Sequence, residues 1–365
     1  MPFNLPKSNI TEITLIGTGG GYGESIVIHL GNNEWVIVDS CQNPNTKESL
    51  PLLYLNKIGV NVEKDVKLVI CTHWHDDHLL GLSQLLQVAK NANFCFTEAT
   101  DRKKFLQLVG LDYAKLSREP SNSSTTEFSK CLEIINERHN RIVLAIENKT
   151  LFGADISPNI RSEVIALSPS DQTILNFNAE ISSLITEFGE SRKKIIIRTP
   201  NEKSIAIFLK LGVHRAILGS DLEVSSDPNE GWTNVLDNSI VIDRKSSLFK
   251  ISHHGSENGY HLRIWNELLE DNPVSKLTPW NKNNRLPTAE MLQLYSNHTD
   301  KLYMTAPIVS LKPKKRDKSI EKIITSLNCK IHEVKYAQGI IQCRNDLQAN
   351  TEWVVETLEG ALKVN

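Results

Sequence analysis

The first seventy residues alternate short apolar runs with polar or glycine-rich breaks. Val, Ile and Thr dominate the runs, as is typical of β-strands, and we expect strands at Glu12–Gly17, Ser25–Leu30, Glu34–Asp39 and Asp65–Cys71. A glycine-rich stretch, Gly17–Gly23, separates the first two runs, and Gly31–Asn33 is a hairpin signal between the next two. The chain therefore begins as antiparallel strands joined by tight turns.

Helical periodicity replaces this pattern at Lys47–Lys57 and Leu79–Ala89. Residues 97–141 are polar and predict a helical or loop insertion, and residues 351–362 read as a C-terminal helix. Further strands are expected at Val164–Leu167, Lys194–Arg198, Ser204–Leu209, Ala216–Leu218, Ser247–Ser252 and Lys301–Met304. Strands in two groups with helices between them predict an α/β (α+β) fold of two sheets covered by helices. No linker divides residues 1–365, so we expect a single domain.

Composition narrows the class of protein. The 365 residues are 40% hydrophobic and 23% charged, with a formal net charge of −2, which is typical of a globular domain. A chain-wide basic surface is excluded, so any contact with nucleic acid must be local. The start of the chain has no apolar core of a secretory signal, and no apolar run reaches the length of a membrane span. We therefore expect a cytoplasmic protein without membrane contact.

The six cysteines do not form a metal-binding pattern. Cys41, Cys71, Cys95, Cys131, Cys329 and Cys343 include no C-x-x-C pair. We expect reduced, mostly buried thiols. Any metal site must be made by histidine and aspartate.

The strongest chemical signal is the segment from His73 to His78, which fits H-x-H-x-D-H. It lies between the apolar strand ending at Cys71 and the start of a helix, so its side chains project from the end of that strand. His73 and His75 are two residues apart in an extended segment and point the same way. Asp77 and His78 follow the bend. Imidazole and carboxylate ligands suit zinc, manganese or iron.

Two more apolar strands end on ligand-type residues. Ala216–Leu218 leads to Asp221, and Ser247–Ser252 leads to the pair His253 and His254. Five of the 11 histidines thus follow apolar strands. This concentration is what a binuclear centre assembled from loop ends requires. Either histidine of the pair could be the ligand, with a slight preference for His254.

At these residues the chain resembles the metallo-β-lactamase superfamily. The resemblance implies an αββα sandwich, two mixed sheets flanked by helices, with a site for two divalent ions (Zn or Mn) along one edge. It implies that Asp39 orients the ligand loop and that Asp221 bridges the ions. The implied metal ligands are His73, His75, Asp77, His78, Asp221 and His254 or His253.

Three stretches are similar to the metallo-β-lactamase domain of the competence protein ComEC. They are Asn201–Leu209, with its N-x-x-S start, Leu218–Glu223 and His253–Ser256. Members of this superfamily commonly carry a further metal-binding histidine, the third-motif histidine, between the H-x-H-x-D-H segment and the bridging aspartate. Here only His139, in a charged segment, and His214, in a turn before a strand, lie in that region, and neither position suits a ligand. We expect Asn201, water or substrate to complete the first ion's shell instead. ComEC-like domains also carry N-x-x-H-P after H-H-G-S, whereas Trp280–Pro287 has no histidine here.

The resemblance implies a metal-dependent hydrolase, with a phosphodiesterase or nuclease acting on nucleic acid or a nucleotide as the leading expectation. Asp77 would ligate an ion and accept a proton from the attacking water. Asn201, Ser204, Gly255 and Ser256 are the expected substrate contacts, although strand packing explains Ser204 equally well. The alternatives are a hydrolase of carboxylic esters, thioesters or lactams, and a partner-activated or non-catalytic module. The sequence names no protein partner.

Two other signals have simpler interpretations. Gly17–Gly23 fits neither nucleotide-loop motif and leads into a strand, so a hairpin turn near the active-site edge explains it better. The basic runs Lys312–Arg316 and Arg192–Lys194 could touch phosphates, but runs of this length are usually solvated faces.

Overall fold

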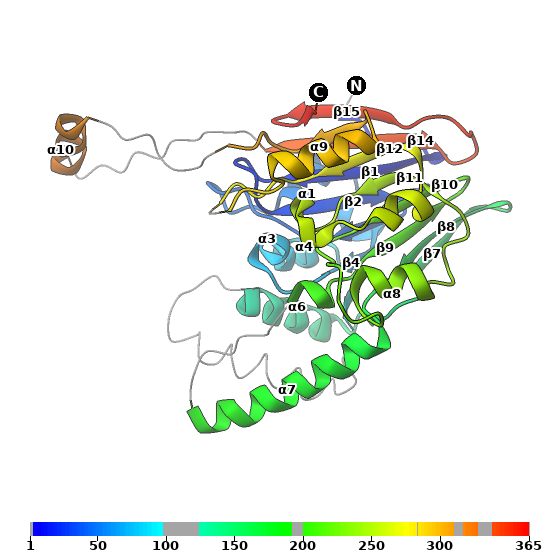
Figure 1. The fold of residues 1–365 in the computed structure, drawn as a ribbon, viewed down its shortest axis with the longest axis horizontal. Helices are drawn as coiled ribbons and strands as arrows, with labels where there is room; N and C mark the ends of the chain where they lie inside the picture. The colour runs from blue at the N-terminus through cyan, green and yellow to red at the C-terminus, as the bar shows by residue number, and fades with distance from the viewer. Residues whose placement is uncertain are drawn as a thin grey trace.

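Two eight-stranded sheets form the centre of the molecule, seen in the computed structural model (Figure 1). The structure describes residues 3–97, 124–191, 200–282, 284–309, 317–327 and 338–364. The first sheet has the order β15 (Val354–Glu359), β14 (Gly339–Asp346), β1 (Ile10–Gly17), β2 (Glu24–His29), β3 (Trp35–Val38), β4 (Val66–Ile70), β5 (Asn93–Thr97) and β6 (Ile142–Ala145). The second has the order β16 (Leu362–Lys363), β13 (Leu302–Met304), β12 (Leu269–Leu277), β11 (Ser246–Lys250), β10 (His214–Leu218), β9 (Ile207–Leu211), β8 (Ile160–Ala166) and β7 (Lys149–Ser157).

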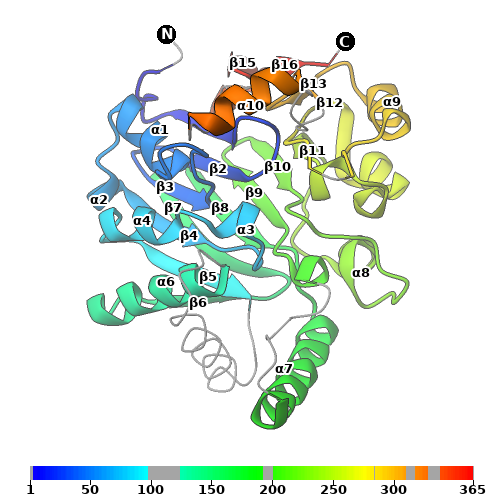
Figure 2. The same cartoon turned by 90° about the vertical axis from the view of Figure 1, so that its left-hand side faces the viewer.

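Helices cover the outer faces of both sheets. Figure 2 shows α1, α4 and α6 on one side and α8 and α9 on the other. The helices are α1 (Leu50–Ile58), α2 (Val62–Asp65), α3 (Asp76–Leu79), α4 (Leu82–Val88), α6 (Ser124–Arg138), α7 (Asp171–Ser191), α8 (Gly231–Asn238), α9 (Ala289–His298) and α10 (Lys318–Ser326). Short helical turns are η1 (Pro200–Lys203), η2 (His253–Gly255), η3 (Glu257–Gly259) and η4 (Ile264–Leu268). None of these helices has the length and apolar character needed to cross a membrane.

Three apolar clusters correspond to the three interfaces of this αββα sandwich. Strand residues alternate between them: Val36 and Val38 of β3 face the second sheet, whereas Trp35 and Ile37 of the same strand pack against the helices. A third cluster, with Trp232 of α8, lies outside the second sheet. A central strand covered on both faces must be apolar at every position, which explains the continuous run in β3. The predicted two-sheet fold is confirmed.

The strand directions bring several loops to one edge of the sandwich. β3 and β4 are parallel neighbours in the first sheet, and β10, β11 and β12 are parallel neighbours in the second. The carboxyl ends of parallel strands meet at a common edge, where binding sites of α/β proteins form. Because β2 is antiparallel to both β1 and β3, the turn between β1 and β2 lies at the same edge as the carboxyl end of β3. It closes with hydrogen bonds between Thr18 N and Gly23 O (3.0 Å) and between Gly21 N and Thr18 O (3.2 Å).

The C-terminal segment corrects one prediction. Residues 351–362 were expected to form a helix, but β15 occupies Val354–Glu359 and pairs antiparallel with β14. Leucine, alanine and glutamate gave this stretch a helical composition. The unpaired edge of β14 and the β-branched residues Val354, Val355 and Thr357 favour a strand, whose charged, exposed side chains suit the edge of a sheet.

The part of the expected insertion at 97–141 that the structure describes, residues 124–141, packs as part of the sandwich. β5 and β6 are parallel neighbours, so a crossover must join them, and α6 belongs to it. Phe128 and Cys131 of α6 lie in the apolar cluster on the first sheet. Residues 98–123, the expected strand Lys194–Arg198, the basic runs Arg192–Lys194 and Lys312–Arg316, and Cys329 lie outside the described residues. The five cysteines within them are buried and free, as predicted.

His29 is buried between β1 and β3 in a neutral form. Its Nδ1 donates to the Ile10 carbonyl (2.7 Å), its Nε2 accepts from the Asn33 amide (3.1 Å), and its ring stacks on Trp35. Burial lowers the pKa of His29 from 6.5 to about 4. A proton on Nε2 would also break the bond from Asn33.

We therefore expect acid to destabilise the fold through His29. Between pH 6.5 and about 4 the unfolded chain binds a proton that the folded chain does not, so the free energy of unfolding falls with pH in this window. Relative to His29→Gln, the wild type should lose up to about 3 kcal/mol between neutral pH and pH of about 4. Urea unfolding at several pH values measures this loss. His139→Asn, at an exposed histidine, is the control. Parallel pH curves for the wild type and His29→Gln would contradict the prediction.

Candidate metal centre

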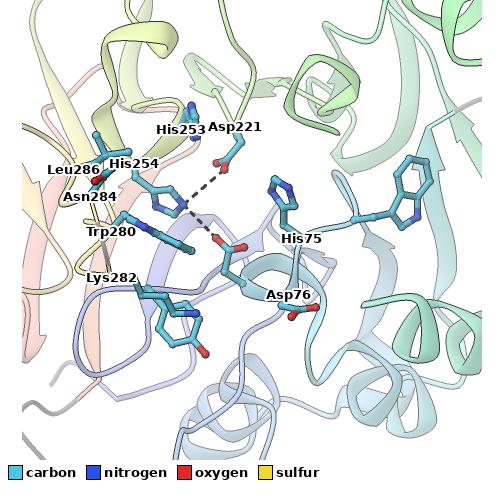
Figure 3. Close-up of a pocket in the computed structure, with 12 residues that line it drawn as sticks. His75, Asp76, Asp221, His253, His254, Trp280, Lys282, Asn284 and Leu286 are labelled. Carbon is cyan, nitrogen blue, oxygen red and sulfur yellow. Dashed lines mark hydrogen bonds and ion pairs between the residues drawn. The ribbon is translucent and has the colours of Figure 1, made fainter. Parts of the chain in front are cut away.

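The predicted ligands meet at the edge where the parallel strands end, and Figure 3 shows three of them, His75, Asp221 and His254. Asp39 follows β3, the His73–His78 segment follows β4, Asp221 follows β10, and His254 follows β11. Because these strands belong to both sheets, the site spans the open edge of the sandwich. Their ligand-bearing loops are far apart in the sequence and adjacent in space.

Asp39 organises the loop after β4. Its Oδ1 accepts a hydrogen bond from Thr72 N and its Oδ2 one from Thr72 Oγ1, both at 2.7 Å. The same Oδ2 lies 2.8 Å from His78 Nδ1. Since Thr72 Oγ1 donates to Asp39, it is left to accept from His73 Nδ1, 3.0 Å away. Asp39 thus sets the orientation of two histidines, directly for His78 and through Thr72 for His73.

This arrangement frees the Nε2 atoms for ligation. With Nδ1 of His73 and of His78 engaged, Nε2 is the ring nitrogen left to face a metal ion. His254 is held in the same way, because its Nδ1 donates to the Thr278 carbonyl at 3.0 Å. Its Nε2 lies 3.2 Å from Asp77 Oδ2. Burial lowers the pKa values of His78 and His254, but Asp221 and Asp77 outweigh it and raise both above normal. A metal ion would therefore displace the Nε2 proton of each.

The ligand atoms form two groups that share one carboxylate. Within each group the ligand atoms lie within 4.8 Å of one another. The first group is Asp77, His78, Asp221 and His254, and the second is His73, His75 and Asp221. Buried His78 Nε2 and Asp221 Oδ1 have no hydrogen-bond partner among the described residues. These two atoms face each other at 3.4 Å, and because buried polar atoms nearly always make a hydrogen bond, a cation between them would satisfy both. Nitrogen and carboxylate donors are a set that zinc and manganese accept.

Electrostatics within the cluster keep its carboxylates ionised. Burial raises the pKa of Asp221, but His78 and His254 outweigh it and bring the pKa well below the usual range. Asp77 behaves in the same way: burial raises its pKa, and the nearby His78 and His254 imidazoles lower it below normal. Burial instead lowers the pKa of His73 well below its ordinary value, with His78 adding to the effect. The centre therefore offers anionic oxygens beside a neutral His73 imidazole.

A buried ion pair supports Asp221 from behind. Lys250 of β11 contacts the carboxylate of Glu24 at the start of β2, donates to the Ser220 carbonyl at 3.0 Å, and lies 3.9 Å from Asp221 Oδ1. Both side chains of the pair are buried. Burial lowers the pKa of Lys250, but Glu24 and Asp221 outweigh it and raise the pKa above normal. The pair joins the two sheets beneath the site, and the sequence gave no signal for it.

The structure separates the roles of the histidine pair. Only His254 joins the ligand groups found among the described residues. His253 lies beside them, with its Nδ1 2.9 Å from Ser256 Oγ and 3.1 Å from Glu223 Oε1, and its Nε2 3.1 Å from Asn201 Nδ2. Asn201 also donates to Glu223 at 2.8 Å. His253 and Asn201 thus belong to a polar cluster beside the metal groups.

Three expected substrate contacts are placed behind the site. Ser204 is fully buried, and its Oγ lies 2.7 Å from Ser220 Oγ and accepts from Asp221 N at 3.2 Å. Gly255 is buried beside Pro287 and Tyr295. Ser256 bonds His253 and caps η3. None of the three lines the pocket over the ligands in the described part of the chain, so their contact with substrate stays a prediction.

The candidates for a third-motif histidine lie away from the centre. His139 is an exposed residue after α6. His214, at the start of β10, has its Nε2 2.8 Å from the Asp346 carbonyl. Asp221 follows the other end of β10, so the strand separates His214 from it. Neither histidine belongs to the ligand groups found among the described residues.

A pocket of about 550 Å³ opens over the ligand groups. Its lining includes five predicted residues, His75, Asp77, Asp221, His253 and His254, together with Tyr22, Trp280 and Lys282. The last three were not predicted as site residues. Tyr22 lies in the glycine-rich turn, and Trp280 and Lys282 lie in the stretch that departs from the ComEC-like pattern.

Comparison with known proteins agrees with this fold. The model of the metallo-β-lactamase superfamily matches residues 18–120, a minority of the chain that includes Asp39 and the His73–His78 segment. The two mixed sheets flanked by helices are those of the metallo-β-lactamase fold. No curated protein matches the chain.

Several solved structures are distantly similar. The metallo-β-lactamase fold protein YhfI from Bacillus subtilis shares 13% identity over 66% of this chain and 70% of its own, with a TM-score of 0.33. Human tRNase Z, short form, shares 11% over 80% and 90%, with a TM-score of 0.36. The Rm3 metallo-β-lactamase shares 16% over 73% and 85%, with a TM-score of 0.34. Similarity this low says nothing about the activity of this chain.

The buried pair predicts a specific stability pattern in the metal-free protein. Lys250→Met leaves the Glu24 carboxylate buried and unpaired, which should lower the free energy of unfolding by about 3–5 kcal/mol. Lys250→Met combined with Glu24→Leu removes both charges and should recover most of that loss. Urea unfolding of the two variants measures the difference. Equal stability of the single and double variants would show that no such charge pair is buried there.

Proposed function

We propose that this protein is a metal-dependent hydrolase that cleaves phosphodiesters, with single metal ions held in each of its two ligand groups. The observation that carries the proposal is the Asp221 carboxylate, which belongs to both groups at once. A shared carboxylate between adjacent sites is what a two-metal hydrolase needs to hold its ions a few ångström apart. The pocket above gives a substrate access to both groups.

Charge favours a phosphodiester over a neutral ester. Two divalent cations would exceed the charge of the Asp39, Asp77 and Asp221 carboxylates by one unit, while Lys250 and Glu24 neutralise each other. The filled site would therefore be positive and attract an anionic substrate. The stretches that resemble the ComEC domain, around Asn201, Asp221 and His254, support the same class of substrate.

Bound zinc or manganese ions supply Lewis-acid chemistry and activate a water molecule near neutral pH. The chain's own residues orient and complete that chemistry. Asp77 lines the pocket as an ionised carboxylate and accepts the proton of the attacking water at its Oδ atoms. Asp39 holds His78 and, through Thr72, His73 in the orientation that ligation needs. Trp280, packed against the His254 ring at 5.3 Å, excludes water from one side of the centre.

Purified protein with manganese or zinc should cleave bis(p-nitrophenyl) phosphate and single-stranded DNA. Asp77→Ala removes a ligand and the proton acceptor together, so its rate should fall by at least about a hundredfold. A chelator should abolish the wild-type activity, and added metal should restore it. Release of p-nitrophenol and gel analysis of the DNA measure both reactions. Lys245→Gln, at an exposed lysine, is a control for the handling of variants.

Other outcomes would contradict the proposed substrate class. Cleavage of carboxylic esters, thioesters or lactams without cleavage of phosphodiesters would identify the second kind of metallo-hydrolase. Stoichiometric metal without turnover of any of these substrates would identify a non-catalytic or partner-activated module.

The two ligand groups also predict how many ions each variant retains. The wild type should bind two ions per chain. His254→Ala should lose the ion of the first group and His75→Ala that of the second, whereas Asp221→Ala should weaken both. His253→Ala is the matched control and should retain two ions, because His253 lies outside both groups. Elemental analysis after dialysis measures the stoichiometry. Loss of an ion from His253→Ala, with none lost from His254→Ala, would reverse the assignment of the pair.

A further inference from the structure

We propose that Tyr22, Trp280 and Lys282 form a subsite that stacks an unpaired nucleobase and contacts a neighbouring phosphate, so that the substrate is single-stranded nucleic acid. The inference rests on the proposed phosphodiesterase function and names the substrate class of the same pocket. We refer to these three residues as the aromatic subsite.

Two aromatic rings make a corner beside the metal ligands. Trp280 and Tyr22 meet edge to face, with ring centroids 5.8 Å apart and planes at 88°. Both side chains are half-buried and line the pocket. The other neighbour of Trp280 is the His254 ring, at 5.3 Å. Figure 3 shows Trp280 directly below His254. An apolar flat surface therefore begins where the ligand groups end, within one nucleotide of a phosphate held there.

Lys282 adds a cation to this corner. Its Nζ lies 3.5 Å from the centroid of the Tyr22 ring and 5.2 Å from that of the Trp280 ring. Lys282 is exposed, and none of the ion pairs found among the described residues involves it. The aromatic faces hold the ammonium group at the pocket mouth, where its remaining donors can reach a backbone phosphate.

The loops that carry the subsite are fixed by buried hydrogen bonds. Asn281 N donates to the Gly21 carbonyl at 2.7 Å, and Asn281 Nδ2 donates to the Pro307 carbonyl at 2.8 Å. Asn281 Oδ1 accepts from Val309 N at 3.0 Å. Trp280 and Leu286 exchange two backbone bonds of 2.9 Å that close the loop bearing Lys282. The subsite is thus formed before any ligand arrives.

Gly21 shows why the turn is rich in glycine at this point. Its φ is +67°, and a Cβ there would lie 2.3 Å from Asn281 Nδ2. Only glycine combines that conformation with so close an approach. The glycine-rich turn therefore brings Tyr22 against Trp280. This contact accounts for the glycines without a nucleotide-binding loop.

The size and chemistry of the pocket favour an unpaired base. About 550 Å³ is the size of a typical small-ligand site, which accommodates a single nucleotide. Aromatic side chains bind single strands by stacking on base faces, while cations follow the backbone. In a duplex those faces are hidden by neighbouring bases. A neutral ester or lactam would make no use of Lys282.

Binding of the metal-loaded protein to phosphorothioate oligonucleotides, which resist cleavage, tests the subsite without turnover. Fluorescence anisotropy should show that the wild type binds a labelled oligothymidylate about tenfold or more tightly than an abasic strand of equal length. Trp280→Ala should remove that preference, and Trp280→Phe should retain most of it. Lys282→Gln should weaken both strands equally and reduce the salt dependence by about 0.7 in logarithmic slope. Lys245→Gln is the matched control and should change neither quantity.

Three results would overturn the subsite. The first is equal affinity of the wild type for both strands. The second is an equal loss of affinity for both strands in Trp280→Ala that Trp280→Phe does not recover. The third is an affinity for a duplex equal to that for the single strand. Activity separates this failure from that of the proposed function. Cleavage of bis(p-nitrophenyl) phosphate without a preference for bases overturns the subsite alone. A preference for bases without any phosphodiester cleavage supports the subsite and overturns the proposed function.

Discussion

Negative charge buried at one edge of the sandwich is the constraint on which the rest of the site depends. Asp39, Asp77 and Asp221 are all buried, and each of their carboxylates contacts the ring of His78. Carboxylates cannot stay ionised in a protein interior without compensation. Here the compensation comes from imidazoles in front and from Lys250 behind. His78 Nε2 and Asp221 Oδ1 still lie 3.4 Å apart without a hydrogen bond, and a cation between them would satisfy both.

The two sheets are needed because no single sheet supplies enough ligands. The first sheet contributes Asp39 and the His73–His78 segment, and the second contributes Asp221 and His254. Glu24 and Lys250 join the same two sheets immediately beneath, through a charge pair. The alignment of the sheets and the geometry of the metal centre are therefore linked. A change in sheet packing would displace half of the ligands from the other half.

The polar and aromatic residues around the ligands divide the surroundings into two parts. On one side His253, Glu223 and Asn201 form a hydrogen-bonded cluster. On the other, Trp280 lies between His254 and the Tyr22–Lys282 contact. A substrate phosphate at the centre would thus have a polar wall on one side and a flat apolar wall on the other.

The sequence by itself determined the strands of the first half and the glycine-rich hairpin, because apolar runs broken by glycine are local patterns. It also picked out His73, His75, Asp77, His78 and Asp221 as candidate ligands, because apolar runs that end in His and Asp are local patterns too. Only the tertiary structure decided which of His253 and His254 joins the ligands, since adjacent residues differ there only in direction. It also decided that Ser204 lies behind the site, that residues 351–362 pair as a strand, and that Lys250 and Trp280 belong to the centre. Each of these depends on contacts between residues distant in sequence, which no local pattern records.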